Sequence, residues 1–179
     1  RHAAVSTAYR KADRPWREHI MSDELQWLIA AAPSPKWAAK ILETTPSREA
    51  QIKLWQVLKT ILRLDREDPV AFWREQSELL ERRSAILNEL RLKELRFTGD
   101  ETDLVVGIPE KAIWTGGAAR TPEGQIFMPN IPTEEVFTAP DFRRTEGVVR
   151  ATRPVTVLGD LVEGAIFTFR EGKVVEASA

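Results

Sequence analysis

The fold class is decided over residues 68–100, which read DPVAFWREQSELLERRSAILNELRLKELRFTGD. The first part predicts an amphipathic helix, because apolar residues recur every three or four positions and most charged residues fall between them. Asp68 offers a capping side chain, and Pro69 suits the first helical position. The last part is extended and ends in the turn Thr98-Gly99-Asp100, so we expect one long helix followed by strands, with a boundary near residue 93. The predicted helix face comprises Phe72, Trp73, Gln76, Leu79, Leu80, Arg83, Ile86, Leu87 and Leu90.

The sequence before this boundary differs in composition from the sequence after it. Residues 1–92 hold five of the six tryptophans and no glycine, whereas all nine glycines follow Arg96. The first half predicts a helix over roughly residues 1–20, and further helices beginning at Ser34-Pro35 and Thr45-Pro46. The expected apolar face of the helix after Thr45-Pro46 comprises Ile52, Trp55, Leu58, Ile61 and Leu62.

Residues 25–32 stand out within the helical half because they are short, mostly apolar and followed by prolines. This pattern predicts a buried strand. No second strand is evident among residues 1–92, so we expect the strands that pair with it to belong to sequence outside this chain. An uncovered strand of this kind would make the isolated chain prone to self-association.

The glycine-containing half predicts short strands separated by turns. Glu171-Gly172 joins the last two strands as a hairpin. The expected fold class is α/β, or α+β within this chain, with the helical part of an N-terminal α/β domain over residues 1–92 and a β-rich domain over residues 93–179. The predicted strands cover residues 95–98, 103–108, 125–128, 135–138, 147–152, 155–158, 165–170 and 173–177.

The overall composition limits the partners of the chain. Its 26 basic and 27 acidic residues nearly balance, so no net field favours nucleic acid or an anionic membrane. No apolar run approaches the roughly 20 residues that cross a bilayer. The chain has no cysteine, which fits the cytoplasm. Its two histidines, His2 and His19, are expected on helix surfaces.

The candidate site is the adjacent pair Glu134 and Glu135, within the stretch NIPTEEVFTAP over residues 130–140. Successive strand residues point to opposite faces, so a strand beginning here would aim one carboxylate inward. A buried carboxylate needs a hydrogen-bond donor, a cation or a metal ion. The residues alone favour the other interpretation, two solvated carboxylates at the end of a loop.

Several strings in the sequence resemble the thermophilic aminopeptidase family of metallopeptidases, the aminopeptidase T and aminopeptidase S group. The most specific string is residues 130–140, and Ala30–Ala38 and Asp68-Pro69-Val70 extend the resemblance through the first half. It therefore covers essentially the whole chain. Further matching strings are TDLVVGIP at 102–109, WTGG at 114–117, TPEG at 121–124 and FREGKVV at 169–175.

The resemblance implies an enzyme that removes N-terminal amino acids from peptides with two divalent metal ions, namely cobalt, zinc or magnesium, and that forms a homodimer. Among the family's ligands it implies that only Glu135 is present here. Glu134 is expected to be structural, or to lie near the substrate or support the ligand. The remaining ligands, which include two histidines, are expected beyond Ala179. The chain is then an internal fragment of a longer peptidase, with no metal ion firmly bound by this piece alone.

Five other residues are candidates for contacts near such a site. Trp114, Gly116 and Gly117 could approach a substrate, since glycine lets a backbone come close to a ligand, or could form a plain turn. Asn130 and Thr133 could orient the carboxylates by hydrogen bonds. The rival interpretation is a noncatalytic α+β module whose glutamate pair binds a peptide amine or a partner protein.

Overall fold

The computed structural model describes residues 2–157 and 160–179, and its contacts divide the chain into two compact units. One unit contains Tyr9–Arg83 and Gly116–Val136; the other contains Ser84–Thr115 and Phe137–Ala179 together with the first residues up to Ala8. These units do not coincide with a single cut near residue 93. The reason is that a continuous helix crosses residue 84, while the segment after Gly116 packs against the first half of that helix. The assignment of residues 1–92 and 93–179 to two domains of a longer protein stays a prediction.

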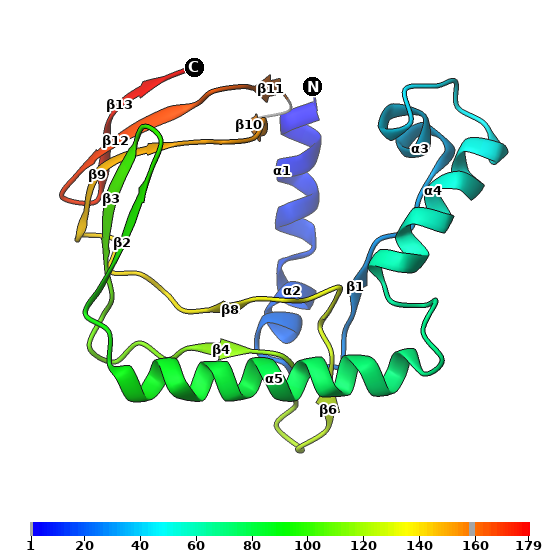
Figure 1. Cartoon of the computed structure of the whole chain (residues 1–179), viewed down its shortest axis with the longest axis horizontal. Helices are drawn as coiled ribbons and strands as arrows, with labels where there is room; N and C mark the ends of the chain where they lie inside the picture. Colours follow the sequence, from blue (N-terminus) through cyan, green and yellow to red (C-terminus); the bar gives the residue numbers. More distant parts are fainter. Residues whose placement is uncertain (1, 158–159) are drawn as a thin grey trace. The chain divides into compact units, whose positions relative to one another are not determined.

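Figure 1 shows the helices of the described residues, and the local sequence reveals the capping residues of two of them, α3 (Pro35–Ile41) and α5 (Pro69–Leu90). The Ser34 hydroxyl accepts the Trp37 N–H at 3.2 Å, and the Asp68 carboxylate accepts the Ala71 N–H at 2.9 Å, so both predicted starts are confirmed. The helices are α1 (His2–Ala12), α2 (Arg14–Met21), α3 (Pro35–Ile41), α4 (Arg48–Ile61) and α5 (Pro69–Leu90).

Two helix predictions are wrong in detail. The helix expected over residues 1–20 is two helices, because Pro15 occupies the first turn of α2 and has no N–H to continue the hydrogen bonding of α1. Helix α4 is capped by Ser47 instead of Thr45, since the Ser47 hydroxyl accepts the Ala50 N–H at 3.1 Å. The start of α4 therefore lies two residues later than predicted.

The faces that α4 and α5 bury match the predicted ones in part, since Leu58, Leu62, Trp73 and Leu80 are buried as expected. In α4 the buried residues are spaced by four positions. The side chains of Ile52, Trp55 and Ile61, which were also expected on this face, are 49, 40 and 46% exposed. In α5, Ile86 and Leu90 are more than half exposed. The residues actually buried are Ala50, Leu54, Leu58 and Leu62 at α4, which form a core with Ala38 of α3, and Trp73, Ser77, Leu80 and Ser84 in α5.

Two serines share the buried face of α5 with Trp73 and Leu80, and at Ser77 another backbone comes very close. A Cβ atom added to Gly117 would lie 2.7 Å from the carbonyl oxygen of Ser77. The Ser77 hydroxyl accepts the Ala118 N–H at 2.8 Å. Close approach of the chain, which periodicity does not report, therefore buries Ser77.

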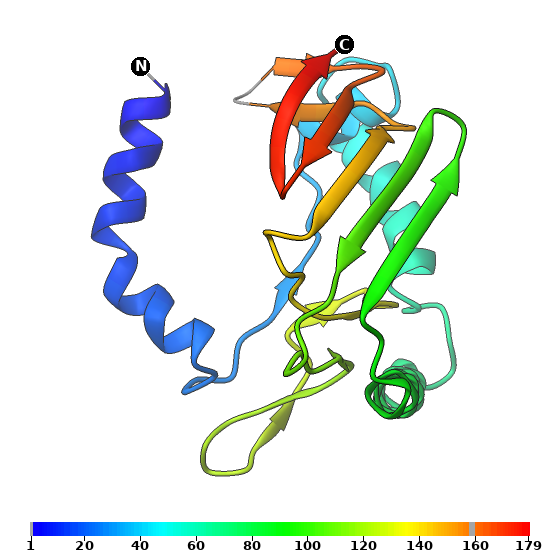
Figure 2. The same cartoon turned by 90° about the vertical axis from the view of Figure 1, so that its left-hand side faces the viewer.

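The second unit contains a five-stranded antiparallel sheet in the order β13-β12-β9-β3-β2 (Figure 2). The predicted hairpin is confirmed: β12 and β13 join through Glu171 and Gly172, which both have positive φ. The strands are β2 (Glu94–Gly99), β3 (Thr102–Gly107), β9 (Thr145–Arg150), β12 (Ile166–Arg170) and β13 (Lys173–Ser178). A separate ladder pairs β10 (Val155–Val157) with β11 (Asp160–Val162); the last residue of the strand expected over 155–158 lies outside the described residues.

An arginine pair anchors the loop that leads into β9. The Asp141 carboxylate, only 11% exposed, accepts hydrogen bonds from Arg143 and Arg144, which lower its pKa to about 2. Arg144 also donates to the Ile108 carbonyl at 2.6 Å. The loop is thereby tied to the end of β3.

The remaining strands are short pairs. β1 (Ile29–Ala30) runs parallel to β7 (Asn130–Ile131), β5 (Ala119–Arg120) pairs with β6 (Ile126–Phe127), and β4 (Thr115–Gly116) pairs with β8 (Val136–Phe137). The expectation of a buried strand over residues 25–32 is wrong, because only two residues are extended in a ladder and Leu28 and Ile29 are 56 and 64% exposed. Its partner β7 lies within this chain, not outside it. Self-association of the chain stays a prediction.

None of the helices in the described ranges is long and apolar enough to cross a membrane.

Candidate functional site

The glutamate loop, residues 132–135, is fixed at its start by backbone pairing. In the ladder that precedes it, Ile29 pairs with Asn130 and Ala30 with Ile131. The Ile29 N–H also donates to the Pro129 carbonyl at 2.8 Å. The Ile131 side chain packs on the core of α3 and α4, so the loop leaves from a well-defined point. The Ile131–Pro132 peptide bond at this point is cis.

The end of the glutamate loop is fixed by the two glycines that the sequence singled out. A Cβ atom on Gly116 would lie 2.7 Å from the Glu135 carbonyl oxygen and 2.8 Å from Cγ1 of Val136. Gly117 has φ +86° and lies against Ser77 of α5. The close approach that these glycines permit is therefore to the protein's own backbone. A contact with substrate stays a prediction.

The backbone of Trp114, in the other unit, is held by the side chain of Asn88. The Asn88 side chain accepts the Trp114 N–H at 2.8 Å and donates to the Trp114 carbonyl at 3.0 Å. This two-point amide clamp fixes the backbone at Trp114 to the last turn of α5. The contacts described for Trp114 assign it to no site with the glutamates, and its proposed substrate role is untested.

Glu134 and Glu135 both lie in the glutamate loop, before β8 begins at Val136, and both side chains are exposed. The prediction that a strand start turns one of them inward is therefore wrong. Pro132 and the irregular backbone after it delay the strand by a residue. The sequence order alone does not distinguish the two carboxylates, but their partners do.

Glu134 has a cationic partner from the end of α4. Its Oε1 atom lies 3.4 Å from Nη2 of Arg63, and its side chain is 63% exposed. Glu135 differs: among the described residues, no hydrogen bond or ion pair reaches its carboxylate. The structure therefore leaves Glu135 as the carboxylate that is available to an external ligand, and Glu134 as the one already engaged.

Arg63 is a residue that the sequence analysis missed. It follows the last turn of α4, and its guanidinium carbon lies 5.6 Å from the centre of the Phe72 ring. Because 71 positions separate Arg63 from Glu134, no local pattern connects them. The signal that was available, an arginine before the Asp68-Pro69 helix start, is common in loops.

The glutamate loop borders an open depression of about 600 Å³. Its other wall is residues 29–31, and its lining brings together four predicted site residues: Asn130, Thr133, Glu134 and Glu135. Carboxylate, amide and hydroxyl oxygens suit a divalent cation, and the unengaged Glu135 carboxylate fits the role of one ligand. In the part of the chain that the structure describes, no three acidic, histidine or cysteine residues gather around a common point. His19 is occupied elsewhere by Glu24, at 2.5 Å.

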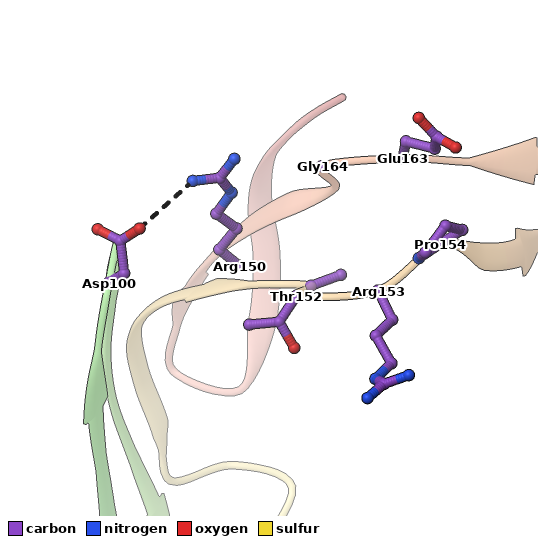
Figure 3. A pocket seen from close by; sticks show the side chains of 8 residues that line it. Asp100, Arg150, Thr152, Arg153, Pro154, Glu163 and Gly164 are labelled. Carbon is purple, nitrogen blue, oxygen red and sulfur yellow. Dashed lines mark ion pairs between the residues drawn. The ribbon is translucent and has the colours of Figure 1, made fainter.

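A second hollow, in the other unit, has mixed charge (Figure 3). Arg150 is turned toward Asp100, whose carboxylate is 3.8 Å away, and Arg150 also pairs with Glu101. Arg153 and Glu163 point away from each other. Its central cation, Arg150, is already paired, and none of the predicted site residues lines this hollow.

Comparison with known proteins identifies the class to which this fold belongs. Residues 1–179 match the family model described as thermophilic metalloprotease (M29), and the chain belongs to that family. It is 44% identical over 172 residues to aminopeptidase T of Thermus aquaticus. This match covers 96% of this chain and 42% of that protein. It is 37% identical over 180 residues to aminopeptidase PepS of Streptococcus thermophilus. This match covers 100% of this chain and 44% of that protein.

The fold agrees with this assignment. The solved structure of wild-type AmpT from Thermus thermophilus superposes with a TM-score of 0.84 at 40% identity, and the match covers 94% of this chain and 41% of that chain. The predicted family resemblance and the α/β fold class are therefore confirmed. The chain spans less than half the length of the relatives that it matches.

Proposed function

We propose that this chain is part of a metal-dependent aminopeptidase in which Glu135 is one ligand of a divalent metal ion. The observation that carries the proposal is the difference between the two neighbours: Arg63 lies 3.4 Å from Glu134, whereas no hydrogen bond or ion pair from the described residues reaches the Glu135 carboxylate. Membership of a metalloprotease family and relatives named aminopeptidases supply the reaction class. A catalytic metal needs at least three protein ligands, so the others come from sequence outside this chain.

Two divalent metal ions, of cobalt, zinc or magnesium, would supply the Lewis acidity that polarises a scissile carbonyl and lowers the pKa of a water molecule, and Glu135 would hold one of them. The residues of this chain bind and orient. Glu135 supplies negative charge, and Asn130 and Thr133, which line the same depression, orient the carboxylates through hydrogen bonds in this proposal. The substrate class is peptides with a free N-terminus. We further infer a homodimer and a cytoplasmic location; the family resemblance supports the first, and the lack of cysteine supports the second.

The test compares Glu135→Gln with Glu134→Gln in the complete protein. Glutamine keeps the size of the side chain and removes its charge, so a loss reports electrostatics at the metal. We expect Glu135→Gln to lower metal occupancy and hydrolysis of an aminoacyl anilide sharply, with a loss of metal affinity at least as large as the about tenfold to hundredfold that removal of a ligand's hydrogen-bond partner costs, and Glu134→Gln to be milder. Metal affinity is measured by competition with a chromophoric chelator.

Equal metal affinity of Glu135→Gln and the parent protein would refute the ligand assignment. A complete protein that binds peptides and holds no divalent metal would support the noncatalytic α+β module instead. If Glu134→Gln is the variant that loses metal, the choice between the neighbours is wrong.

A further inference from the structure

The backbone of Arg63 is held in place independently of the glutamate loop. Arg63 has φ +59°, its N–H donates to the Thr60 carbonyl at 3.1 Å, and Leu64 N–H donates to Lys59 at 2.8 Å. The indole N–H of Trp73 donates to the Leu62 carbonyl at 2.9 Å. The turn after α4 is thus tied both to its own helix and to α5.

The side chain of Arg63 is held by packing on an aromatic ring. Two guanidinium groups lie on Phe72, with the carbons of Arg63 and Arg66 at 5.6 and 5.5 Å from the ring centre. Phe72 itself meets Trp73 edge to face, at 5.3 Å and 87°. Such cation–π contacts restrict where each guanidinium can reach.

Only one end of the Arg63 guanidinium is directed at a partner. Its Nε atom is buried and has no hydrogen-bond partner among the described residues, whereas Nη2 reaches Glu134. A buried donor without a partner is unfavourable. The side chain is therefore oriented by its stacking on Phe72 and by Glu134, at the expense of Nε.

Holding Glu134 has a direct consequence for Glu135. Their Cα atoms are about 3.8 Å apart across one peptide bond, so a fixed Glu134 restricts the path of its neighbour. The cation also neutralises the adjacent negative charge, which would otherwise repel the Glu135 carboxylate.

We infer that Arg63 is a positioning residue of the proposed metal site, which holds Glu134 and thereby fixes the loop that presents Glu135. This inference rests on the proposed function. The inference predicts the direction in which metal affinity changes when Arg63 is removed. A cation that acted only through its charge would repel the metal ion, so its removal would tighten metal binding. Positioning through Glu134 predicts the opposite.

The experiment measures the dissociation constant of zinc in the complete protein by chelator competition. The variants are Arg63→Met, Glu134→Gln and the double variant, and Arg66→Met is the matched control. Arg66 lies on the same Phe72 ring, at 5.5 Å compared with 5.6 Å for Arg63, and makes no hydrogen bond to Glu134. We expect Arg63→Met and Glu134→Gln each to weaken zinc binding by about three- to tenfold. This loss is smaller than for a residue that hydrogen-bonds a metal ligand directly, because the Arg63–Glu134 pair is partly exposed. The double variant should bind no more weakly than the weaker single variant.

Arg66→Met should bind zinc like the parent, and Arg63→Lys should recover part of the loss. With saturating zinc, Arg63→Met should regain most of its activity with an unchanged KM. Thermal unfolding checks that each variant is folded, and the exposed Glu134→Gln serves if Arg63→Met is not.

The inference is overturned if Arg63→Met binds zinc as tightly as Arg66→Met, or more tightly than the parent. It is also overturned if the losses of zinc affinity in the two single variants add up in the double variant. Glu135→Gln is measured alongside. If it retains zinc, the proposed function fails; if it loses zinc while Arg63→Met does not, only the positioning role fails.

Discussion

Replacement of Gly116 by alanine tests whether the glycine pair fixes the path of the chain at Glu135. The new Cβ atom would stand 2.7 Å from the Glu135 carbonyl oxygen, where an ordinary contact begins at 3.4 Å, so the backbone must retreat by about 0.7 Å. Overpacking of this kind costs about 1–3 kcal/mol. Restriction of the unfolded chain offsets about 0.4–1 kcal/mol. We therefore expect Gly116→Ala to lower the free energy of unfolding by about 1–2 kcal/mol.

The measurement is urea unfolding, with Gly99→Ala as the matched control. Gly99 also lies outside the left-handed region, but a Cβ atom there meets nothing within 4 Å, so its replacement should be neutral or stabilising by up to about 1 kcal/mol. In the complete protein, Gly116→Ala should also weaken metal binding because it displaces Glu135. Equal stability of the two variants would refute the argument that close packing against Glu135 and Val136 requires glycine.

Asp141, the Ser47 cap and the single candidate ligand each give a further test. Because arginine neighbours lower the pKa of Asp141 to about 2, its stabilising contribution is complete above the unfolded pKa of about 3.9 and is lost as the pH falls through 2. Asp141→Asn should therefore melt below the parent at pH 7 and approach it near pH 2; a difference that does not change with pH would contradict this. Ser47→Ala should lower the free energy of unfolding by about 1 kcal/mol in urea, whereas Thr45→Ala, two residues earlier, should not. The 179-residue chain alone should not hydrolyse aminoacyl anilides with added cobalt or zinc, and turnover that a chelator abolishes would show this prediction to be wrong.

Local chemistry made much of the fold predictable. Ser34 and Asp68 cap helices through hydrogen bonds to residues three positions on, and Glu171-Gly172 forms a hairpin turn within two residues. The start of α4 was misplaced because the run TTPS at 44–47 contains several possible caps, among which the local pattern does not choose. In α5, Trp73 and Leu80 are buried as predicted, whereas the burial of Ser77 depends on the approach of Gly117, a distant residue.

The candidate site was only partly predictable for the same reason. The family resemblance pointed to residues 130–140, but the direction of each glutamate was inferred from a strand that begins one residue later. The partner of Glu134 and the strand that pairs with Ile29 both come from far along the chain. Contacts of this length leave no periodicity in a single sequence.

The parallel ladder of β1 and β7 also sets an order of events during synthesis. Ile29 and Asn130 pair across about a hundred residues, so at about 5–20 residues per second roughly 5–20 s separate their appearance. Throughout that interval the apolar segment around Leu28 has no strand to pair with. The loop that carries Glu135 therefore reaches its final position late, and conditions that slow translation lengthen the time in which this edge can pair with another chain.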